Sequence, residues 1–274
     1  PKMERLEAAL AKAREQRKGI EPVRAVAGAT AAAARPAGAD WTDLPELVIP
    51  ADRALRNRIS ALLGGKDAVP YDMLRSRTIR QLKEKSWSRL AVTSPDAGCG
   101  KTTISLNLAL SLSRQKDLRV MLFDMDLRRP NLNKTVGHTP ERSFWEVLDG
   151  KVAFEDIAVR MDTNLVLGTN ATPCDHPAEL LQSQTTKDVL DTIEARWKPD
   201  VMIFDMSPML ASDDNVGFLG NVDCAILVAA AESTRMSNID ICEKELAQLT
   251  NVLGVVLNKC RYADDSVGYT YGTY

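Results

Sequence analysis

Hydrophobic positions divide the chain into a long patterned middle and two ends of different character. From about residue 50, short apolar runs alternate with segments whose apolar residues recur every three or four positions. The apolar runs predict strands at residues 89–94, 118–124, 164–168, 200–205, 222–230 and 251–258. The periodic segments predict helices near residues 102–115, 178–196 and 236–250. Because fully apolar strands that alternate with helices are typical of parallel sheets, the pattern predicts an α/β fold: a doubly wound, mostly parallel sheet with helices on both faces.

The two ends differ from this middle part and from each other. Residues 1–18 are charged and carry a helical spacing of apolar residues, which is compatible with a solvated extension or with a docking helix for a partner. Residues 19–49 are rich in Ala, Gly and Pro and predict a linker. We therefore expect one domain at residues 50–262 and a flexible, tyrosine-rich tail at 263–274.

Composition narrows the possible functions. The 274 residues are 45% hydrophobic and 26% charged, as in a typical globular protein. The net charge of −2 provides no basic field for nucleic-acid binding, so no nucleic-acid partner is expected. No apolar run approaches 18 residues, no signal peptide is visible, and the five cysteines show no CxxC spacing. These features together predict a cytoplasmic protein.

The segment SPDAGCGKTT at residues 94–103 follows the first clear strand and precedes an apolar helix. This is the context that a phosphate-binding loop requires. Gly98 and Gly100 allow the backbone to turn its N–H groups towards phosphate oxygens, and the helix start adds its positive end. Lys101 is predicted to reach the β- and γ-phosphates, and the hydroxyl of Thr102 to bind Mg²⁺.

Carboxylates follow two later strands of the predicted sheet. Asp124 and Asp126 leave the strand in VMLFDMDLRRP, and Asp205 ends the strand in VMIFDMSP. Ligands of open α/β sheets bind at the carboxyl ends of the strands, so these three side chains are expected to face the lysine loop. A single Asp at this position often only starts a turn, whereas three beside a GKT loop favour a site for a magnesium nucleotide.

These motifs resemble those of the bacterial tyrosine kinases, the P-loop autokinases of capsule and exopolysaccharide synthesis. The family's modified Walker A loop tolerates a non-glycine first residue, here Pro95. Its DxDxR motif is matched by DMDLR, and its DxxP form of Walker B by DMSP. PAELLQS and GVVLNK resemble two further family segments. The related ParA/MinD ATPases carry a lysine at the loop start, where this chain has Asp96.

The resemblance implies a protein-tyrosine kinase that uses ATP and Mg²⁺. The implied ATP-binding residues are Ala97, Gly98, Cys99, Gly100, Lys101, Thr102, Thr103, Asn258 and Arg261. The implied ligands of Mg²⁺ are Thr102, Asp126 and Asp205. The catalytic set is Lys101, Asp124, Asp126, Arg128 and Asp205. In this set, Asp124 is the candidate that accepts the phenol proton, and Arg128 binds the incoming chain or stabilises the transferred charge.

Four of the five tyrosines lie in the last 13 residues, where the family carries its autophosphorylation site. The implied acceptors, modified in trans, are Tyr262, Tyr269, Tyr271 and Tyr274. The resemblance also implies a transmembrane chain-length-determining partner that activates the kinase and recruits it to the inner membrane face, and a cognate phosphotyrosine phosphatase.

A homo-oligomer is implied as well. The family's ring-forming ExxRxxR helix aligns with Val69, Asp72 and Arg75, so only the last arginine is in register and ring formation stays open. A regulatory ATPase switch without kinase activity is the alternative function. A structural scaffold with an inactive nucleotide site is disfavoured by the presence of the lysine, the threonine and the three aspartates.

Overall fold

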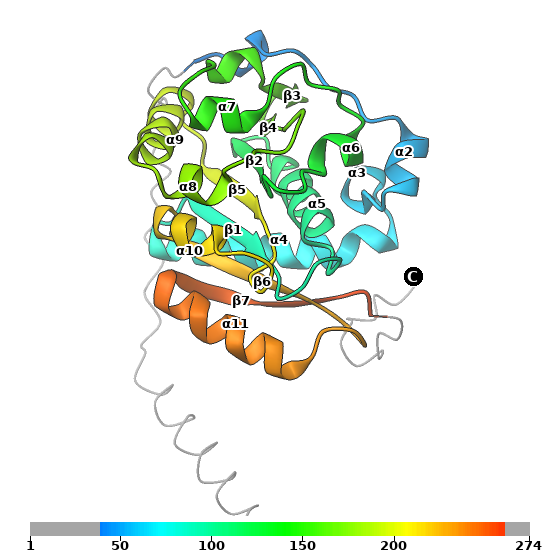
Figure 1. Ribbon diagram of the computed structural model, residues 1–274. Helices are drawn as coiled ribbons and strands as arrows, with labels where there is room; N and C mark the ends of the chain where they lie inside the picture. Colours follow the sequence, from blue (N-terminus) through cyan, green and yellow to red (C-terminus); the bar gives the residue numbers. More distant parts are fainter. Residues whose placement is uncertain (1–38, 261–274) are drawn as a thin grey trace, which may run out of the picture. The chain divides into compact units, whose positions relative to one another are not determined.

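The computed structural model describes residues 39–260, which form a seven-stranded sheet between two layers of helices (Figure 1). The strand order is β3-β4-β2-β5-β1-β6-β7, and every neighbouring pair is parallel except β3 with β4. The strands are β1 Arg89–Thr93, β2 Val120–Met125, β3 Val159–Met161, β4 Leu165–Gly168, β5 Val201–Met206, β6 Cys224–Ala230 and β7 Asn251–Asn258. The predicted doubly wound, mostly parallel α/β fold is thereby confirmed.

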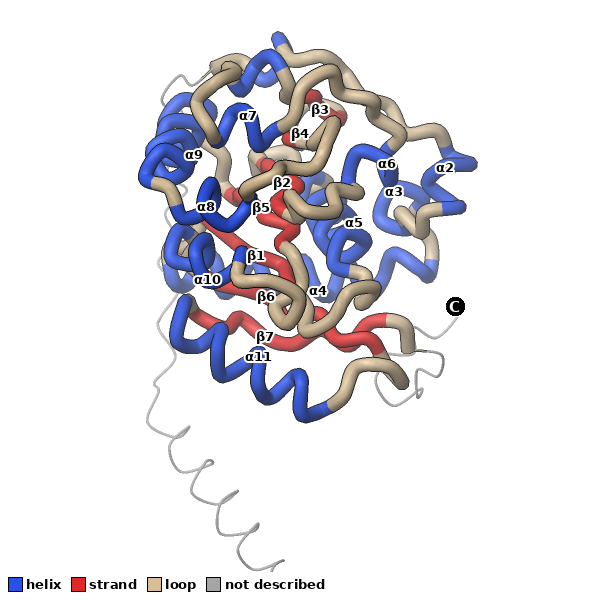
Figure 2. Tube along the Cα trace, in the orientation of Figure 1, coloured by secondary structure: helices blue, strands red, loops and turns tan. Residues whose placement is uncertain are grey.

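Helices occupy the connections between successive strands except the short turn from β3 to β4 (Figure 2). The α-helices are α2 Ala51–Arg56, α3 Ser60–Leu63, α4 Val69–Lys85, α5 Lys101–Ser113, α6 Leu132–Val136, α7 Phe144–Leu148, α8 Pro177–Gln182, α9 Gln184–Trp197, α10 Asp214–Phe218 and α11 Met236–Leu249. Short 3₁₀ turns occur at η1 Trp41–Asp43, η2 Lys66–Ala68, η3 Phe154–Asp156 and η4 Leu219–Asn221. No helix within residues 39–260 combines the length and apolar character needed to span a bilayer.

Alternation along the central strands builds one core on each face of the sheet. In β5, Met202 and Phe204 belong to the core that α7, α9 and α11 cover, whereas Ile203 belongs to the core beneath α4 and α5. Successive strand residues point to opposite faces, so Asp205 lies on the same face as Ile203. It therefore faces α5, the helix that begins at the glycine-rich loop.

The strand register brings the predicted aspartates together. In the parallel pair of β2 and β5, Asp124 is directly opposite Asp205, and Val92 of β1 is opposite Asp205 on the other side. The carboxyl ends of β1, β2 and β5 therefore meet at one edge of the sheet, where α/β proteins bind their ligands.

Two local features differ from the sequence-based expectation. The helix expected near residues 178–196 is two helices, because Ser183 adopts an extended conformation and its hydroxyl caps α9 at the backbone N–H of Thr186. The sheet also gains the short antiparallel edge strand β3, which the apolar pattern did not predict.

The segment that aligns with the family's ring-forming helix makes contacts within the chain. The carboxylate of Asp72 on α4 accepts hydrogen bonds from Ser111 at 2.7 Å and from Arg114 at 2.8 Å, both at the end of α5, and from Arg75 at 3.3 Å. Asp72 and Arg75 therefore help to hold α4 against α5.

Part of the predicted linker belongs to the packed domain. Trp41, Leu44 and Ile49 are buried, and the indole N–H of Trp41 donates to the carbonyl of Trp197 at 2.9 Å. The ring of Trp41 also packs edge-on against the Trp197 ring. The domain thus begins near residue 40 and not at residue 50. The predicted helix at 1–18, the linker before residue 39 and the tail lie outside the described residues.

We expect Trp41→Ala to lower the free energy of unfolding by about 3–5 kcal/mol, because it empties a large buried site and removes the indole hydrogen bond to the Trp197 carbonyl. Urea unfolding followed by circular dichroism measures the change. Val48→Ala is the control, since that side chain is 73% exposed and its loss should change little. Equal stability of the Trp41→Ala variant and the unmodified protein would show that residues 39–49 do not contribute to the folded domain.

Candidate active site

The glycine-rich loop joins β1 to α5 and turns through two left-handed glycines. Gly98 has φ +79° and Gly100 has φ +94°, values that side-chain-bearing residues rarely adopt. The amide of Asn258, at the end of β7, donates to the carbonyl of Cys99 at 2.8 Å. A Cβ atom at position 100 would displace this amide, so a side chain there would disturb the contact with Asn258 as well as strain the backbone. Asn258 thus contacts the loop backbone in this structure.

Neighbouring segments fix the loop from two sides. The backbone N–H groups of Met209 and Leu210 donate to the carbonyls of Ser94 and Pro95 at 2.8 and 3.1 Å. On the other side, the amide of Asn238 on α11 lies 3.3 Å from the carboxylate of Asp96. Ala97 and Gly98 form the exposed tip of the loop, whereas Cys99 is buried. The loop is therefore held in a turn with its tip open to solvent.

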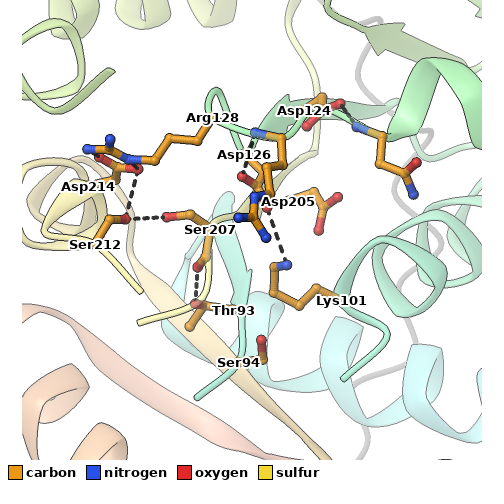
Figure 3. A network of polar contacts seen from close by, with 12 residues as sticks. Thr93, Ser94, Lys101, Asp124, Asp126, Arg128, Asp205, Ser207, Ser212 and Asp214 are labelled. Carbon is orange, nitrogen blue, oxygen red and sulfur yellow. Dashed lines mark hydrogen bonds and ion pairs between the residues drawn. The ribbon is translucent and has the colours of Figure 1, made fainter. Parts of the chain in front are cut away.

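Lys101 is the cation of the site. It is the first residue of α5, its side chain is almost fully buried, and its ammonium lies 3.5 Å from the carboxylate of Asp126 (Figure 3). The side chain of Asp126 is 14% exposed, and its other oxygen accepts from the backbone N–H of Arg129 at 3.2 Å. Burial raises the pKa of Asp126, and the charge of Lys101 partly opposes that rise.

Asp205 is fully buried beside the first turns of α5. One carboxylate oxygen accepts from the hydroxyl of Ser105 at 3.3 Å, and the other has no hydrogen-bond partner among the described residues. Burial raises the pKa of Asp205 to about 6, although Lys101 and the hydroxyl of Thr102 act in the opposite direction. Ser105 was not predicted as a site residue; its spacing of four from Lys101 places both on one helix face and was the available signal.

Asp124 is buried next to Asp205 and holds the start of α6. One of its oxygens accepts from the backbone N–H groups of Asn131 and Leu132, each at 3.0 Å, and its other oxygen has no partner in the described part of the chain. Burial and the adjacent charge of Asp205 raise the pKa of Asp124 well above the ordinary value. Two neighbouring carboxylates therefore each present an unpaired oxygen at this edge of the sheet.

This donor set fits a magnesium ion. Mg²⁺ prefers oxygen ligands and usually keeps several waters, so it needs only one or two protein carboxylates. Asp205 offers a buried, unpaired carboxylate oxygen beside the hydroxyl-bearing start of α5, and Asp126 directly follows the neighbouring strand β2. Within residues 39–260 no cluster of three or more His, Cys, Asp or Glu side chains is arranged to hold a metal.

Arg128 is turned towards a different partner. Its guanidinium makes two 2.9 Å hydrogen bonds to the carboxylate of Asp214, which is the first residue of α10 and is fully buried. In Figure 3 the Arg128 side chain runs towards Asp214 and away from Lys101. Sequence reasoning did not identify Asp214, because the pairing joins residues 86 positions apart.

The remaining predicted residues lie at the loop or outside the described part. Thr102 and Thr103 are half-buried in the first turn of α5. Arg261 and the four tail tyrosines, Tyr262, Tyr269, Tyr271 and Tyr274, lie outside the described residues. The structure thus brings together Lys101 with the aspartates at the carboxyl ends of β2 and β5, and directs the Arg128 guanidinium elsewhere.

A loop of this geometry before a helix, with a buried lysine and carboxylates on the adjacent strands, defines a P-loop nucleotide-binding domain. Residues 90–267 match the family model of the CobQ/CobB/MinD/ParA nucleotide binding domain. The chain is 31% identical over 199 residues to the tyrosine-protein kinase YwqD of Bacillus subtilis strain 168, covering 69% of this chain and 80% of that protein. The chain belongs to this nucleotide-binding family and, within it, to the bacterial tyrosine kinases.

Two further similarities define the extent of the match. The chain is 28% identical over 183 residues to the tyrosine-protein kinase ptk of Acinetobacter johnsonii, covering 66% of this chain but only 24% of that protein. The structure superimposes on the kinase domain of the Escherichia coli tyrosine kinase ETK with a TM-score of 0.66 at 25% identity, covering 76% of this chain and 80% of that one. The match therefore corresponds to a kinase domain that also occurs within longer proteins.

Asp205 gives the stability of the nucleotide-free protein a defined pH dependence. Its folded-state pKa of about 6 exceeds the ordinary 3.8, so the protonated carboxyl stabilises the fold. This stabilisation is complete below about pH 4 and is lost as the pH rises through about 6. The Asp205→Asn variant cannot ionise at this position, so it should lose much less stability as the pH rises. At pH 8 we expect its free energy of unfolding to exceed that of the unmodified protein by about 1–3 kcal/mol. Urea unfolding at a series of pH values measures the difference.

The exposed Asp240 on α11 provides the control, because Asp240→Asn should follow the pH profile of the unmodified protein. If the Asp205→Asn variant is no more stable than the unmodified protein at pH 8, the buried charge of Asp205 does not destabilise the fold, and the prediction is wrong.

Proposed function

We propose that this chain is an ATP- and Mg²⁺-dependent protein-tyrosine autokinase whose acceptors are Tyr262, Tyr269, Tyr271 and Tyr274. The observation that carries the proposal is the meeting of Lys101 with Asp124, Asp126 and Asp205 at one sheet edge, in a chain whose relatives are named tyrosine-protein kinases. Phosphoryl transfer depends mainly on positioning and charge stabilisation, which these residues supply.

Nucleotide binding would begin at the loop. Backbone N–H groups of residues 97–103 cradle the phosphates at the positive end of α5. Lys101 exchanges its contact with Asp126 for the β- and γ-phosphate oxygens, which releases the Asp126 carboxylate for the metal. Asn258 and Arg261 are the proposed contacts at the adenine end.

Thr102, Asp126 and Asp205 are the proposed holders of Mg²⁺, which when bound neutralises charge on the transferring phosphate. The carboxylates must be ionised to bind a cation. The raised pKa of Asp205, about 6, therefore makes this site weaker in acid than an ordinary carboxylate site would be.

Asp124 is the proposed acceptor of the phenol proton. A phenol has an ordinary pKa near 10 and is a weak nucleophile when neutral. The raised pKa of Asp124 makes it a stronger base than an ordinary aspartate, and its second oxygen is unpaired among the described residues.

The acceptor segment follows directly after β7. The last residue of β7, Asn258, contacts the carbonyl of Cys99 in the loop, so the end of the described chain lies close to the proposed nucleotide site. Thirteen extended residues span at most ~44 Å, which is enough to reach a neighbouring molecule. To enter its own site the chain would have to fold back sharply, so we propose transfer between subunits of a homo-oligomer.

The biological role proposed is regulation of exopolysaccharide or capsule polymerisation and export. A transmembrane chain-length-determining partner would activate the kinase and recruit it to the inner membrane face, and a cognate phosphotyrosine phosphatase would reset it. Each phosphate adds about −1.5 to −2 charges, so several on one tail would repel each other and loosen an assembly held by tail docking.

A regulatory ATPase switch is the second candidate, because the matched family model also covers MinD and ParA. Such a switch would release ADP and phosphate without changing the mass of the protein. The kinase instead transfers the phosphate to the chain itself.

We predict that ATP and Mg²⁺ add phosphate to the purified full chain and that Lys101→Met reduces the rate by roughly two to three orders of magnitude, because charge stabilisation at the phosphates is lost. Replacing the four tail tyrosines with Phe should abolish the added mass, as judged by intact-mass spectrometry. Tyr71→Phe is the control, since it changes the remaining tyrosine, which lies half-buried on α4. ATP turnover without any added mass, with and without the activating partner, would support the switch instead.

Transfer between subunits has its own test. An active chain with all four tail tyrosines replaced by Phe should phosphorylate a Lys101→Met chain that keeps its tyrosines, because each supplies what the other lacks. Mass spectrometry distinguishes the two chains. If the Lys101→Met chain remains unmodified while the unmodified protein alone phosphorylates itself, transfer is within one chain.

A further inference from the structure

Asp214 and Arg128 form a paired contact next to the site that the proposed chemistry does not use. The Nε and Nη2 atoms of Arg128 donate to the two oxygens of Asp214, each at 2.9 Å, and the hydroxyl of Ser212 donates to one of these oxygens at 2.9 Å. Asp214 is fully buried, whereas the Arg128 side chain is 46% exposed. Such two-bond contacts fix orientation as well as charge, because the guanidinium is a rigid planar fork.

Loss of Arg128 and loss of Asp214 have unequal energetic costs. Without Arg128, the carboxylate of Asp214 would remain buried with only the Ser212 hydroxyl as its donor, which is strongly unfavourable for a charge. Without Asp214, the half-exposed guanidinium of Arg128 could turn into water. The contact is therefore required mainly by the buried carboxylate.

The pair links the ends of β2 and β5. Arg128 lies two residues after Asp126, so it holds the segment that leaves β2. Ser212 lies 3.5 Å from Ser207, which is two residues after Asp205, and the amide of Asn215 donates to the Ser207 carbonyl at 3.0 Å. Figure 3 shows this line of contacts from Arg128 through Asp214 and Ser212 to Ser207. The hydroxyl of Thr93, the last residue of β1, also donates to the Ser207 carbonyl, at 2.8 Å.

We propose that Asp214 is a positioning residue of this site: its contact with Arg128 sets the separation between Asp126 and Asp205. The proposal rests on the proposed function, because it assumes that these two aspartates hold the metal of a bound nucleotide. Arg128 is then a link between the two strand ends and acts through them, without touching the phosphates. Loss of the contact lowers the affinity for Mg²⁺ and leaves metal-free nucleotide binding intact.

The first measurement is the thermal unfolding midpoint of the full chain in four forms: unmodified, Arg128→Gln, Asp214→Asn and the double variant. We expect Arg128→Gln to lower the midpoint most, because it leaves a buried carboxylate without its cation, and the double variant to regain most of that loss. Asp213→Asn is the matched control, since that neighbouring carboxylate is 71% exposed and lies 3.9 Å from Arg128. Additive effects of the two single substitutions would overturn the pairing.

The second measurement is binding of a fluorescent ADP analogue as a function of Mg²⁺ concentration. In Asp214→Asn we expect the Mg²⁺ concentration for half-maximal binding to rise about 10-fold, as is typical when a residue that orients metal ligands is lost. Binding of the analogue in EDTA should be unchanged. Arg128→Lys keeps the positive charge but loses the second hydrogen bond. It should therefore be more thermally stable than Arg128→Gln, whereas its Mg²⁺ affinity should stay below that of the unmodified protein. A normal Mg²⁺ dependence in Asp214→Asn or in Arg128→Lys would overturn the positioning role.

Neither measurement depends on tyrosine phosphorylation. A chain that binds the magnesium nucleotide as described but never gains phosphate would refute the kinase assignment and leave the positioning role intact. If the unmodified chain phosphorylates itself but the Asp214→Asn variant has a normal Mg²⁺ dependence, the positioning role is refuted and the kinase assignment stands.

Discussion

The structure depends above all on the parallel register that sets Asp124 directly opposite Asp205. Two buried carboxylates side by side are unfavourable. Burial raises the pKa of both; the charge of Asp205 adds to the rise at Asp124, and the charge of Asp126 adds to the rise at Asp205. Lys101 offsets only part of this negative charge and lies nearest to Asp126. The site itself is therefore short of positive charge, and a bound cation would relieve the repulsion between these carboxylates.

The opposite face of the same strands prevents the register from slipping. Phe123 and Phe204 lie next to Asp124 and Asp205 in sequence and point to the other side, where their rings stack 5.4 Å apart. Phe144 stacks on Phe123 at 4.7 Å and continues the aromatic cluster towards α7. A shift of one residue would bury the carboxylates among these rings and expose the rings to the loop side. The aromatic core thus holds the acidic residues where the loop lysine meets them.

The sequence predicts the parts of this arrangement that are local. Apolar runs mark the central strands, and the order of strand, glycine loop and helix locates Lys101, because neighbours in sequence determine these features. The contacts of Asn258 with Cys99, of Asp214 with Arg128 and of Trp41 with Trp197 join residues 159, 86 and 156 positions apart. Pattern and spacing carry no information about such pairs. The same limit explains why the sequence does not predict the contact of Arg128 with a buried aspartate.

The residue at the start of the loop explains why the positive charge that neutralises the phosphates must come from other parts of this site. The ParA/MinD ATPases have a lysine at this position, whereas Asp96 here brings a negative charge whose carboxylate faces the amide of Asn238. Lys101 is then the loop's own cation. A bound nucleotide carries several negative phosphates, so neutralisation requires the metal that Asp126 and Asp205 are suited to hold. Catalysis in this chain consequently depends more on the geometry of its aspartates than it would in a loop with two lysines.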